Sequence, residues 1–321
     1  MTMTLSYYQT SSEQQQAYRP VTLIGKDCMI KSQVSLAPLT SFRVGGPAEW
    51  YVAPKNFAEI QASFQWAATE NLTVTMLGAG SNLLISDEGL PGLVINSKYL
   101  RHTHFDAETG LLTVGAGESI PRLAWQVARM GWQGLEWSVG IPGSVGGAVV
   151  MNAGAQGSCV ADILVSAEIL TMQGESLVLN KHDLSYSYRK SKLQGQPVIV
   201  TQATFQLQPG ANPEQVMNTT TENFEKRRTS QPYHLPSCGS VFRNPGPKTA
   251  GWLIEESGLK GYQIGMAQVA HRHANFILNC GGAKANDIFR LIYHVQEQVE
   301  QRWSLLLEPE VKIMGQFPAS Y

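Results

Sequence analysis

Short apolar runs alternate with glycine-rich turns through the first two thirds of the chain. Their spacing predicts strands at residues 72–77, 92–96, 111–114, 167–171 and 198–206. Two segments between these strands repeat apolar residues at helical spacing. Asn56 and Glu59 form a capping pattern for a helix that runs to about residue 70. Both helices are expected to cover sheets, and the second has an apolar face formed by Ile120, Leu123, Val127 and Met130.

The pattern changes after Gly210, where helical signals dominate. Asn212 and Pro213 are typical first residues of a helix. Further along, the pattern predicts a short helix from Thr249 to Gly258, a strand at 275–278, a long amphipathic helix at 286–303 and a strand at 311–314. Residues 1–34 show no periodicity, so organised structure is expected to begin near Ser41. The predicted class is α+β, with an extension at 1–35, a domain at 36–209 that divides near 100, and a domain at 210–321.

Composition narrows the function to small-molecule chemistry. The 321 residues are 43% hydrophobic, and 24 Lys and Arg balance 25 Asp and Glu. This balance gives no electrostatic footprint for nucleic acid or an acidic membrane surface. No apolar run approaches the roughly 20 residues that span a bilayer, and no export signal is recognisable. A reducing cytoplasm is predicted because the cysteines are sparse and form no C-x-x-C pair: Cys28, Cys159, Cys238 and Cys280.

A glycine-bearing loop directly follows the strand predicted at 72–77. Glycines let backbone N–H groups approach phosphate oxygens, and the loop adds polar side chains as donors. A Rossmann fingerprint is not matched, because Leu83 stands where the third glycine belongs and a strand follows. A tight turn without a ligand is the alternative. The predicted pyrophosphate contacts are Gly78, Ala79, Gly80, Ser81, Asn82 and Leu83.

A second small-residue segment, at 140–155, contains no charge. Such backbone suits a flat, uncharged ring system, although close packing through glycine is the alternative. The two segments together match what an adenine–flavin dinucleotide requires. Because neither loop holds His or Cys, FAD is expected to bind non-covalently. The predicted contacts of this second wall are Gly143, Ser144, Gly146, Gly147, Asn152 and Gly154, with Arg43 from a neighbouring segment.

Several motifs occur in an order that resembles the UDP-N-acetylenolpyruvoylglucosamine reductases over about residues 36–315. They are Ser41–Ala48, Leu77–Leu84, Ile141–Gly147, Tyr188–Ser191, Gly239–Pro245, Gly258–Gly261 and His273–Phe276. The resemblance implies two FAD-binding subdomains of the vanillyl-alcohol-oxidase (PCMH) type and a C-terminal α+β substrate-binding domain. It also implies NADPH-dependent reduction of UDP-N-acetylglucosamine enolpyruvate to UDP-N-acetylmuramate, for peptidoglycan synthesis.

The few residues between Ser191 and the strand at 198 leave no room for the added tyrosine loop of the longer type of this family. The chain therefore resembles the shorter second type. It departs from the family pattern in its first roughly 35 residues and at Ala270, where serine is expected. Neither departure touches the residues that carry the chemistry.

The resemblance assigns catalytic roles to Ser240, Arg189 and Glu310. Hydride transfer to the vinyl carbon leaves negative charge on the neighbouring carbon and its carboxylate. Arg189 would stabilise that charge, Glu310 would support the carboxylate and Ser240 would deliver the proton. From the residues alone, Arg189 is equally a surface arginine, Ser240 a turn residue and Glu308 a rival of Glu310.

For the UDP end, cations and amides near the end of the helix after Asn212 suit a diphosphate. Lys226 instead fits a solvated helix end. The predicted substrate contacts are Arg228, Asn244, Lys260 and His273. No catalytic metal is predicted, because His271 and His273 have no third ligand nearby. A serine hydrolase is rejected, because Phe242 replaces the second glycine of the nucleophile motif.

Two other classes of function remain open at this point. A flavin oxidase or dehydrogenase on the same scaffold would share the FAD segments without needing Ser240 and Glu310. A non-catalytic protein that binds flavin or a nucleotide sugar would show no NADPH oxidation. The expected partners are small molecules, one pocket is expected to serve NADPH and the UDP-sugar in turn, and the chain is expected to be a cytoplasmic monomer.

Overall fold

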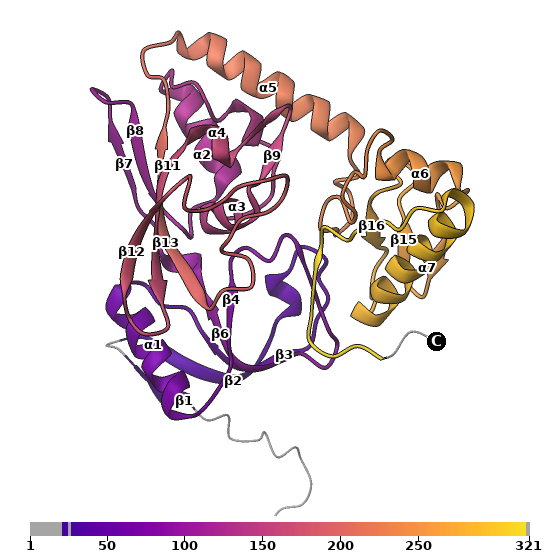
Figure 1. Cartoon of the computed structure of the whole chain (residues 1–321), viewed down its shortest axis with the longest axis horizontal. Helices are drawn as coiled ribbons and strands as arrows, with labels where there is room; N and C mark the ends of the chain where they lie inside the picture. Colours follow the sequence, from indigo (N-terminus) through magenta and orange to yellow (C-terminus); the bar gives the residue numbers. More distant parts are fainter. Residues whose placement is uncertain (1–20, 25–26, 319–321) are drawn as a thin grey trace, which may run out of the picture.

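The computed structural model describes residues 21–24 and 27–318 and contains two five-stranded sheets followed by a helix-rich unit (Figure 1). The first sheet has the order β1-β2-β3-β6-β4. Its strands are β1 (Val21–Leu23), β2 (Met29–Ser35), β3 (Pro47–Val52), β6 (Leu90–Asn96) and β4 (Val74–Leu77). The first three pair antiparallel, whereas β6 pairs parallel with both β3 and β4.

Helix α1 (Phe57–Thr69) makes the crossover from β3 to β4. Asn56 caps it, because its side-chain oxygen accepts the N–H of Glu59 at 3.0 Å. The buried side chains Ile60 and Phe64 belong to one apolar cluster with the sheet residues Leu93 and Ile95. The capping pattern and the helical periodicity read from the sequence are confirmed here.

The second sheet is fully antiparallel, with the order β12-β11-β13-β8-β7. Its strands are β7 (Thr103–Asp106), β8 (Leu111–Gly115), β11 (Leu164–Thr171), β12 (Ser176–Asn180) and β13 (Val198–Gln206). Three helices and a small hairpin lie between β8 and β11: α2 (Ile120–Arg129), α3 (Val145–Met151), β9 (Gly154–Ala155), β10 (Ser158–Cys159) and α4 (Val160–Ile163).

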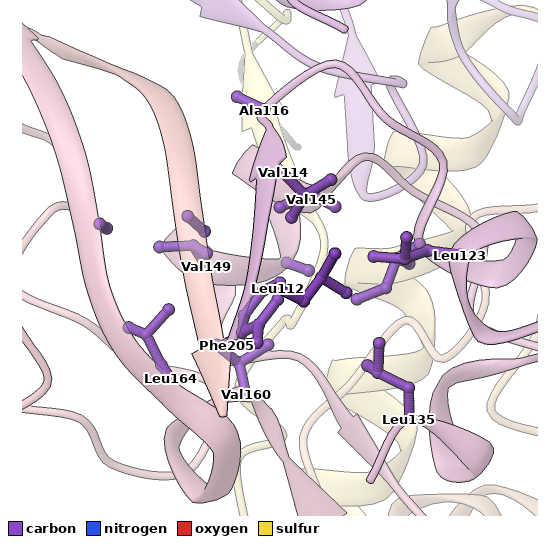
Figure 2. Packing of buried hydrophobic residues seen from close by; sticks show 14 of the residues in the cluster. Leu112, Val114, Ala116, Leu123, Leu135, Val145, Val149, Val160, Leu164 and Phe205 are labelled. Carbon is purple, nitrogen blue, oxygen red and sulfur yellow. The ribbon is translucent and has the colours of Figure 1, made fainter. Parts of the chain in front are cut away.

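The core of this second unit lies between the sheet and its helices. In Figure 2, Val145 and Val149 of α3 lie near Leu112 and Phe205 of the sheet, and all four are buried in one cluster. Leu123 of α2 joins the same cluster. Packing of α3 against β8 and β13 fixes the glycine-bearing start of α3 relative to the sheet.

Helix α5 (Pro213–Ser230) leaves the second unit along α2, where Trp125 and Phe224 meet edge to face with ring centroids 5.9 Å apart. The last unit contains α6 (Ala250–Glu256), α7 (Ala285–Trp303) and the sheet β14-β15-β16 (Gln263–Ile264, Ala267–Val269 and Ile277–Asn279). Short 3₁₀ turns occupy Ala37–Leu39, Ser97–Tyr99 and Glu136–Ser138. No helix among the described residues is long and apolar enough to cross a membrane.

The end of the chain returns to the first unit. There β17 (Lys312–Met314) pairs in parallel with β5 (Leu83–Ile85), the strand that follows the first glycine loop. Nearby, the carboxylate of Asp87 accepts the N–H groups of Ala285 and Asn286, each at 2.9 Å. A side chain of the first unit thereby caps helix α7 of the last unit, so the units are tied by directional contacts.

The elements predicted from periodicity are present, with ends shifted by a few residues. The expectation that structure begins near Ser41 is wrong, because β1 and β2 lie within 21–35, where β1 pairs with β2 and β2 pairs with β3. Polar residues occupy much of β2, and Gln33 in it has a positive φ of 52°, so no apolar run marks this strand. The predicted extension therefore includes strands of the first sheet, and its residues 1–20 lie outside the described part of the chain.

Helix α3 was not expected, because two glycines at 146 and 147 disfavour a helix. It forms because Ser144 caps its first turn and Val145 and Val149 are buried beneath it. The predicted boundaries near 100 and 210 fall in the connections between β6 and β7 and between β13 and α5.

Asp87→Ala should reduce the free energy of unfolding by about 1–3 kcal/mol, because it removes two charge-assisted hydrogen bonds and the cap of α7. Asn212→Ala is the matched control, since Asn212 caps α5 with one bond to the N–H of Glu214. For Asn212→Ala we expect the free energy of unfolding to fall by about 1 kcal/mol, because only a local cap is lost. Urea unfolding followed by tryptophan fluorescence compares the two, and a smaller loss for Asp87→Ala than for Asn212→Ala would contradict the interdomain role.

Candidate active site

One cavity of about 750 Å³ lies where the three units meet. The first unit contributes the loop between β4 and β5, and the second unit contributes the start of α3 and the segment before β13. The last unit contributes residues near 240 and 310. Sequence-predicted residues in its lining are Gly78, Ala79, Gly80, Ser81, Asn82, Leu83, Gly143, Ser144, Gly146, Gly147, Gly154, Arg189, Ser240, Asn244 and Glu310.

The loop between β4 and β5 presents its backbone to the cavity. Gly80 has a φ of 66°, and a Cβ there would collide with the carbonyl oxygen of Leu39, so the turn requires glycine. Its own carbonyl accepts the N–H of Ser41 at 3.1 Å. The backbone N–H groups of residues 79–82 donate to no other group in the described part of the chain. They are therefore available as donors on the cavity wall.

The glycines of the second wall serve two purposes. At Gly146 a Cβ would stand 2.9 Å from the Cβ of Ala116, so this glycine allows close packing of α3. At Gly147 the nearest atom to an added Cβ is Ser144 Oγ at 3.4 Å, and at Gly143 it is Ser81 Oγ at 4.0 Å. These last two glycines keep space open in the cavity. Close packing is therefore shown at Gly146, and the open space at Gly143 and Gly147 is compatible with the predicted ligand platform.

Two predicted cofactor residues do not line the cavity. Arg43 is exposed and has a φ of 60°. Asn152 is buried at the end of α3, where its Nδ2 donates to the carbonyl of Ser187 at 3.0 Å and its Oδ1 accepts the N–H of Ala161 at 3.0 Å. Asn152 thus ties the second wall to the segment that carries Arg189.

The predicted catalytic residues Arg189 and Glu310 form an ion pair, with Arg189 Nε 2.9 Å from Glu310 Oε1. Arg189 also donates from Nη2 to the carbonyl of Gly154 at 2.7 Å. The backbone of Glu310 is held on both sides. Its N–H donates to the carbonyl of Val241 at 2.7 Å, and its carbonyl accepts from Asn82 Nδ2 at 3.0 Å. One residue pair therefore joins all three walls.

Burial raises the pKa of Glu310, and the nearby cations of Arg189 and Arg243 oppose this rise without cancelling it. The carboxyl can therefore keep its proton to a higher pH than an exposed glutamate. Burial and the nearness of Glu310 also raise the pKa of Cys238, which lines the same cavity. Glu308, the rival considered from the sequence, has a side chain that is 60% exposed and is absent from the cavity lining.

Ser240 lies in a loop whose backbone is fixed by Asn275. The side chain of Asn275 accepts the N–H of Phe242 at 2.9 Å and donates to its carbonyl at 2.8 Å, and the backbone carbonyl of Asn275 accepts the N–H of Val241 at 2.8 Å. Because Asn275 is buried, these bonds are shielded from water. The asparagine of the His-Ala-Asn-Phe segment is thus a structural support of the Ser240 loop.

The predicted substrate residues are placed differently from one another. Asn244 lines the cavity, and its Oδ1 caps α6 through the N–H of Ala250 at 3.0 Å. Lys260 forms an ion pair with Glu255, and His273 packs against Phe276 with ring centroids 4.8 Å apart. Burial lowers the pKa of His273. Neither Lys260 nor His273 lines the cavity.

The cation at the end of α5 that reaches the cavity is Arg227, whereas Arg228 pairs with Glu225 at 2.8 Å on the exposed side. Helical spacing could have predicted this choice. Arg227 follows the inward-facing Thr220 by seven residues and Phe224 by three, so all three share one face of the helix. Sequence reasoning also missed Lys312, which lines the cavity two residues after Glu310. In an extended strand this spacing places both side chains on one face.

The lining residues fit a flavin dinucleotide. Free backbone N–H groups at 79–82 suit a pyrophosphate, and the space kept open by Gly143 and Gly147 suits a flat ring. No three His, Cys, Asp or Glu side chains among the described residues gather in a way that could hold a metal ion.

Comparison with known proteins supports this assignment. A family model described as "FAD binding domain" matches residues 48–180, and one described as "UDP-N-acetylenolpyruvoylglucosamine reductase, C-terminal domain" matches residues 231–314. The reductase of this name from Nostoc sp. is 63% identical over 300 residues, which cover 94% of this chain and 91% of that protein. Its counterpart from Synechocystis sp. is 53% identical over 299 residues, which cover 92% and 94%.

Among solved structures, UDP-N-acetylenolpyruvylglucosamine reductase from Thermus caldophilus superposes with a TM-score of 0.77 at 35% identity, covering 93% of this chain and 100% of that chain. Fold, cavity and matches together define a flavoprotein oxidoreductase with an FAD-binding domain. The chain belongs to the UDP-N-acetylenolpyruvoylglucosamine reductase family. The predicted family, fold class and enzyme class are confirmed.

Gly147→Ala should weaken FAD binding while leaving the protein without flavin as stable as before, or more stable by up to about 1 kcal/mol. Alanine favours a helix over glycine, and its methyl group would occupy space that the cavity keeps open. Flavin affinity is measured by fluorescence titration and stability by urea unfolding of the flavin-free protein. Unchanged affinity would remove Gly147 from the cofactor wall.

Proposed function

We propose that the chain reduces the enolpyruvyl double bond of UDP-N-acetylglucosamine enolpyruvate with NADPH, giving UDP-N-acetylmuramate for peptidoglycan synthesis. The observation that carries the proposal is that Ser240, Arg189 and Glu310 line the cavity walled by the two glycine segments. FAD, when bound non-covalently there, supplies the hydride that it has received from NADPH.

The cations around Glu310 suit a substrate that develops negative charge. Arg189 presents a permanently charged guanidinium next to the cavity, and its bonds to Glu310 and Gly154 hold it in one orientation. The enolpyruvyl carboxylate would lie against Arg189, where charge delocalised into its oxygens is stabilised. A proton on Glu310 would let this residue donate a hydrogen bond to the same carboxylate.

Ser240 is proposed as the proton donor to the carbon next to the carboxylate. A serine hydroxyl is a weak acid, yet the carbon that accepts the proton is strongly basic, so position matters more than acidity. The Asn275 bonds, which fix the backbone of the same loop at Phe242, support this role. After the transfer, water entering the open cavity would restore the proton on Ser240 Oγ.

The UDP end is proposed to extend towards α5 and Asn244. Arg227 and Gln231, which line the cavity, supply donors suited to a diphosphate. Contacts with Arg228, Lys260 or His273 would require the substrate to reach beyond the lining. The proposal includes a monomer in the cytoplasm, with NADPH and the UDP-sugar occupying the cavity in turn.

The proposed activity has a direct spectroscopic test. Protein reconstituted with FAD should be yellow, anaerobic NADPH should bleach it, and the enolpyruvyl substrate should restore the oxidised spectrum with formation of one UDP-N-acetylmuramate per flavin. Reduction of the flavin by a simple alcohol, followed by return of the oxidised spectrum with oxygen, would instead support a flavin oxidase. Flavin that remains oxidised in NADPH would support a binding protein.

Ser240→Ala should separate the two half-reactions. Bleaching by NADPH needs no proton on a substrate carbon and should keep a near-normal rate. Return of the oxidised spectrum should slow by about 10²–10⁴-fold, the usual contribution of a positioned proton donor. Ser240→Cys should lose less, because a thiol keeps a transferable proton. Rapid-mixing absorbance measures both steps, and reoxidation of the alanine variant at the wild-type rate would assign the donor role elsewhere.

A further inference from the structure

Arg243 is a buried cation three residues after Ser240, in the same motif. Its side chain is 8% exposed, and its backbone N–H donates to the carbonyl of Glu308 at 2.9 Å. The guanidinium bridges two partners: Nη1 lies 2.9 Å from Glu308 Oε1, and Nη2 donates to the backbone carbonyl of Arg189 at 3.3 Å. Nε has no partner among the described residues. Arg243 therefore connects the Ser240 loop to Arg189.

The backbone of Arg189 needs such support. Its φ is 57°, a left-handed conformation that is unfavourable for a non-glycine residue. Its carbonyl accepts a bond from Gln194 Nε2 at 3.0 Å as well as the bond from Arg243. Because the backbone sets the direction of the side chain, this conformation sends the Arg189 guanidinium to Glu310 and Gly154.

Arg243 also acts on Glu310 through its charge. The groups that face Glu310 are the cations Arg189 and Arg243 and the thiol of Cys238. Both cations lower the pKa of Glu310 against the rise that burial causes. Without the charge of Arg243, the pKa of Glu310 would rise further.

We propose that Arg243 is a positioning residue, which holds Arg189 and Glu310 in place for protonation of the substrate carbon while making no contact with FAD or NADPH. The inference rests on the proposed function and adds a residue to it. Arg243 is absent from the cavity lining, so it acts through Arg189 and Glu310. Loss of Arg243 should therefore affect the half-reaction with the enolpyruvyl substrate and spare the half-reaction with NADPH.

Arg243→Met is the informative variant, because it removes the charge and the bridge but fills most of the buried volume. Glu308 is 60% exposed and stays solvated, and Gln194 still satisfies the Arg189 carbonyl, so no buried charge or polar group is stranded. In the FAD-loaded variant, NADPH should bleach the flavin within about 2-fold of the wild-type rate. Reoxidation should slow by about 10–100-fold, the usual effect of a small misplacement.

The pH profile of reoxidation adds a result that a merely structural residue would not produce. The inflection that belongs to Glu310 should move to higher pH in Arg243→Met, since the folded pKa of this carboxyl rises when a cation is lost. This direction holds whether the protonated or the ionised form is active. Arg243→Lys should keep the wild-type inflection but recover only part of the rate, because one ammonium cannot span both partners.

Lys190→Met is the matched control. Lys190 Nζ lies 3.9 Å from the same Glu308 carboxylate, its side chain is 56% exposed, and no side-chain bond joins it to Arg189 or Glu310 in the described structure. Its removal takes one positive charge from beside Glu308. Because exposed ion pairs contribute little, neither half-reaction should change in rate by more than about 2-fold. Flavin absorbance per chain and the Tm report separately whether each variant is folded.

Reoxidation of a folded Arg243→Met protein at the wild-type rate and pH dependence would overturn the inference, as would equal slowing of both half-reactions. If the variant loses its flavin or unfolds, Glu308→Ala decides, because alanine removes the acceptor of the Arg243 Nη1 bond. Selective slowing of reoxidation supports the bridge, and wild-type kinetics rejects it. A wild-type protein that bleaches with NADPH but is not reoxidised by the enolpyruvyl substrate would contradict the proposed function instead.

Discussion

The parallel pairing of β17 with β5 is the contact on which the cavity depends. It joins Lys312 to Leu83 in register, so the chain segment that carries Glu310 is held beside the first glycine loop. Parallel strands bond through the backbone and cannot be joined by a tight turn. The last unit must therefore fold between them and return, and this return closes the third wall. The pairing acts together with the bonds from Asn82, Val241 and Arg189 to hold Glu310 at the cavity.

The returning segment brings Glu310 and Lys312 into a partly buried cluster of charged side chains. Cations outnumber carboxylates in this cluster, which contains Arg189, Arg243, Lys312, Glu308 and Glu310. Burial disfavours charge on Glu310, as its raised pKa shows, and an additional anion from a substrate would balance the excess positive charge. The same burial lowers the pKa of Lys312, again because a charged group is removed from water. An excess of cations therefore surrounds Glu310.

Close backbone approach and hydrogen bonds to the backbone shape the glycine walls of the cavity and the Ser240 loop. Gly146 allows α3 to approach Ala116, and this approach brings Gly147 and the cap residue Ser144 to the cavity. Asn275 fixes the Ser240 loop in a similar way, through bonds to backbone rather than to any ligand. Within one short motif, some residues therefore line the cavity and others hold its backbone in place. Asn152 belongs to the second kind, because its side chain donates to the carbonyl of Ser187.

By itself the sequence determined the elements with strong periodicity, the family and the residue types of the chemistry, because these depend on local spacing and on motifs. Residue chemistry alone did not separate Glu310 from Glu308, which only the family resemblance distinguished. The prediction of Arg228 missed Arg227, since the two have equal chemistry and only packing decides which side chain is enclosed. Local patterns did not predict the strands at 21–35 or helix α3, because the stability of these elements comes from partners distant in the chain. The bridge from Arg243 to Arg189 exists only in three dimensions, where two motifs 54 positions apart meet.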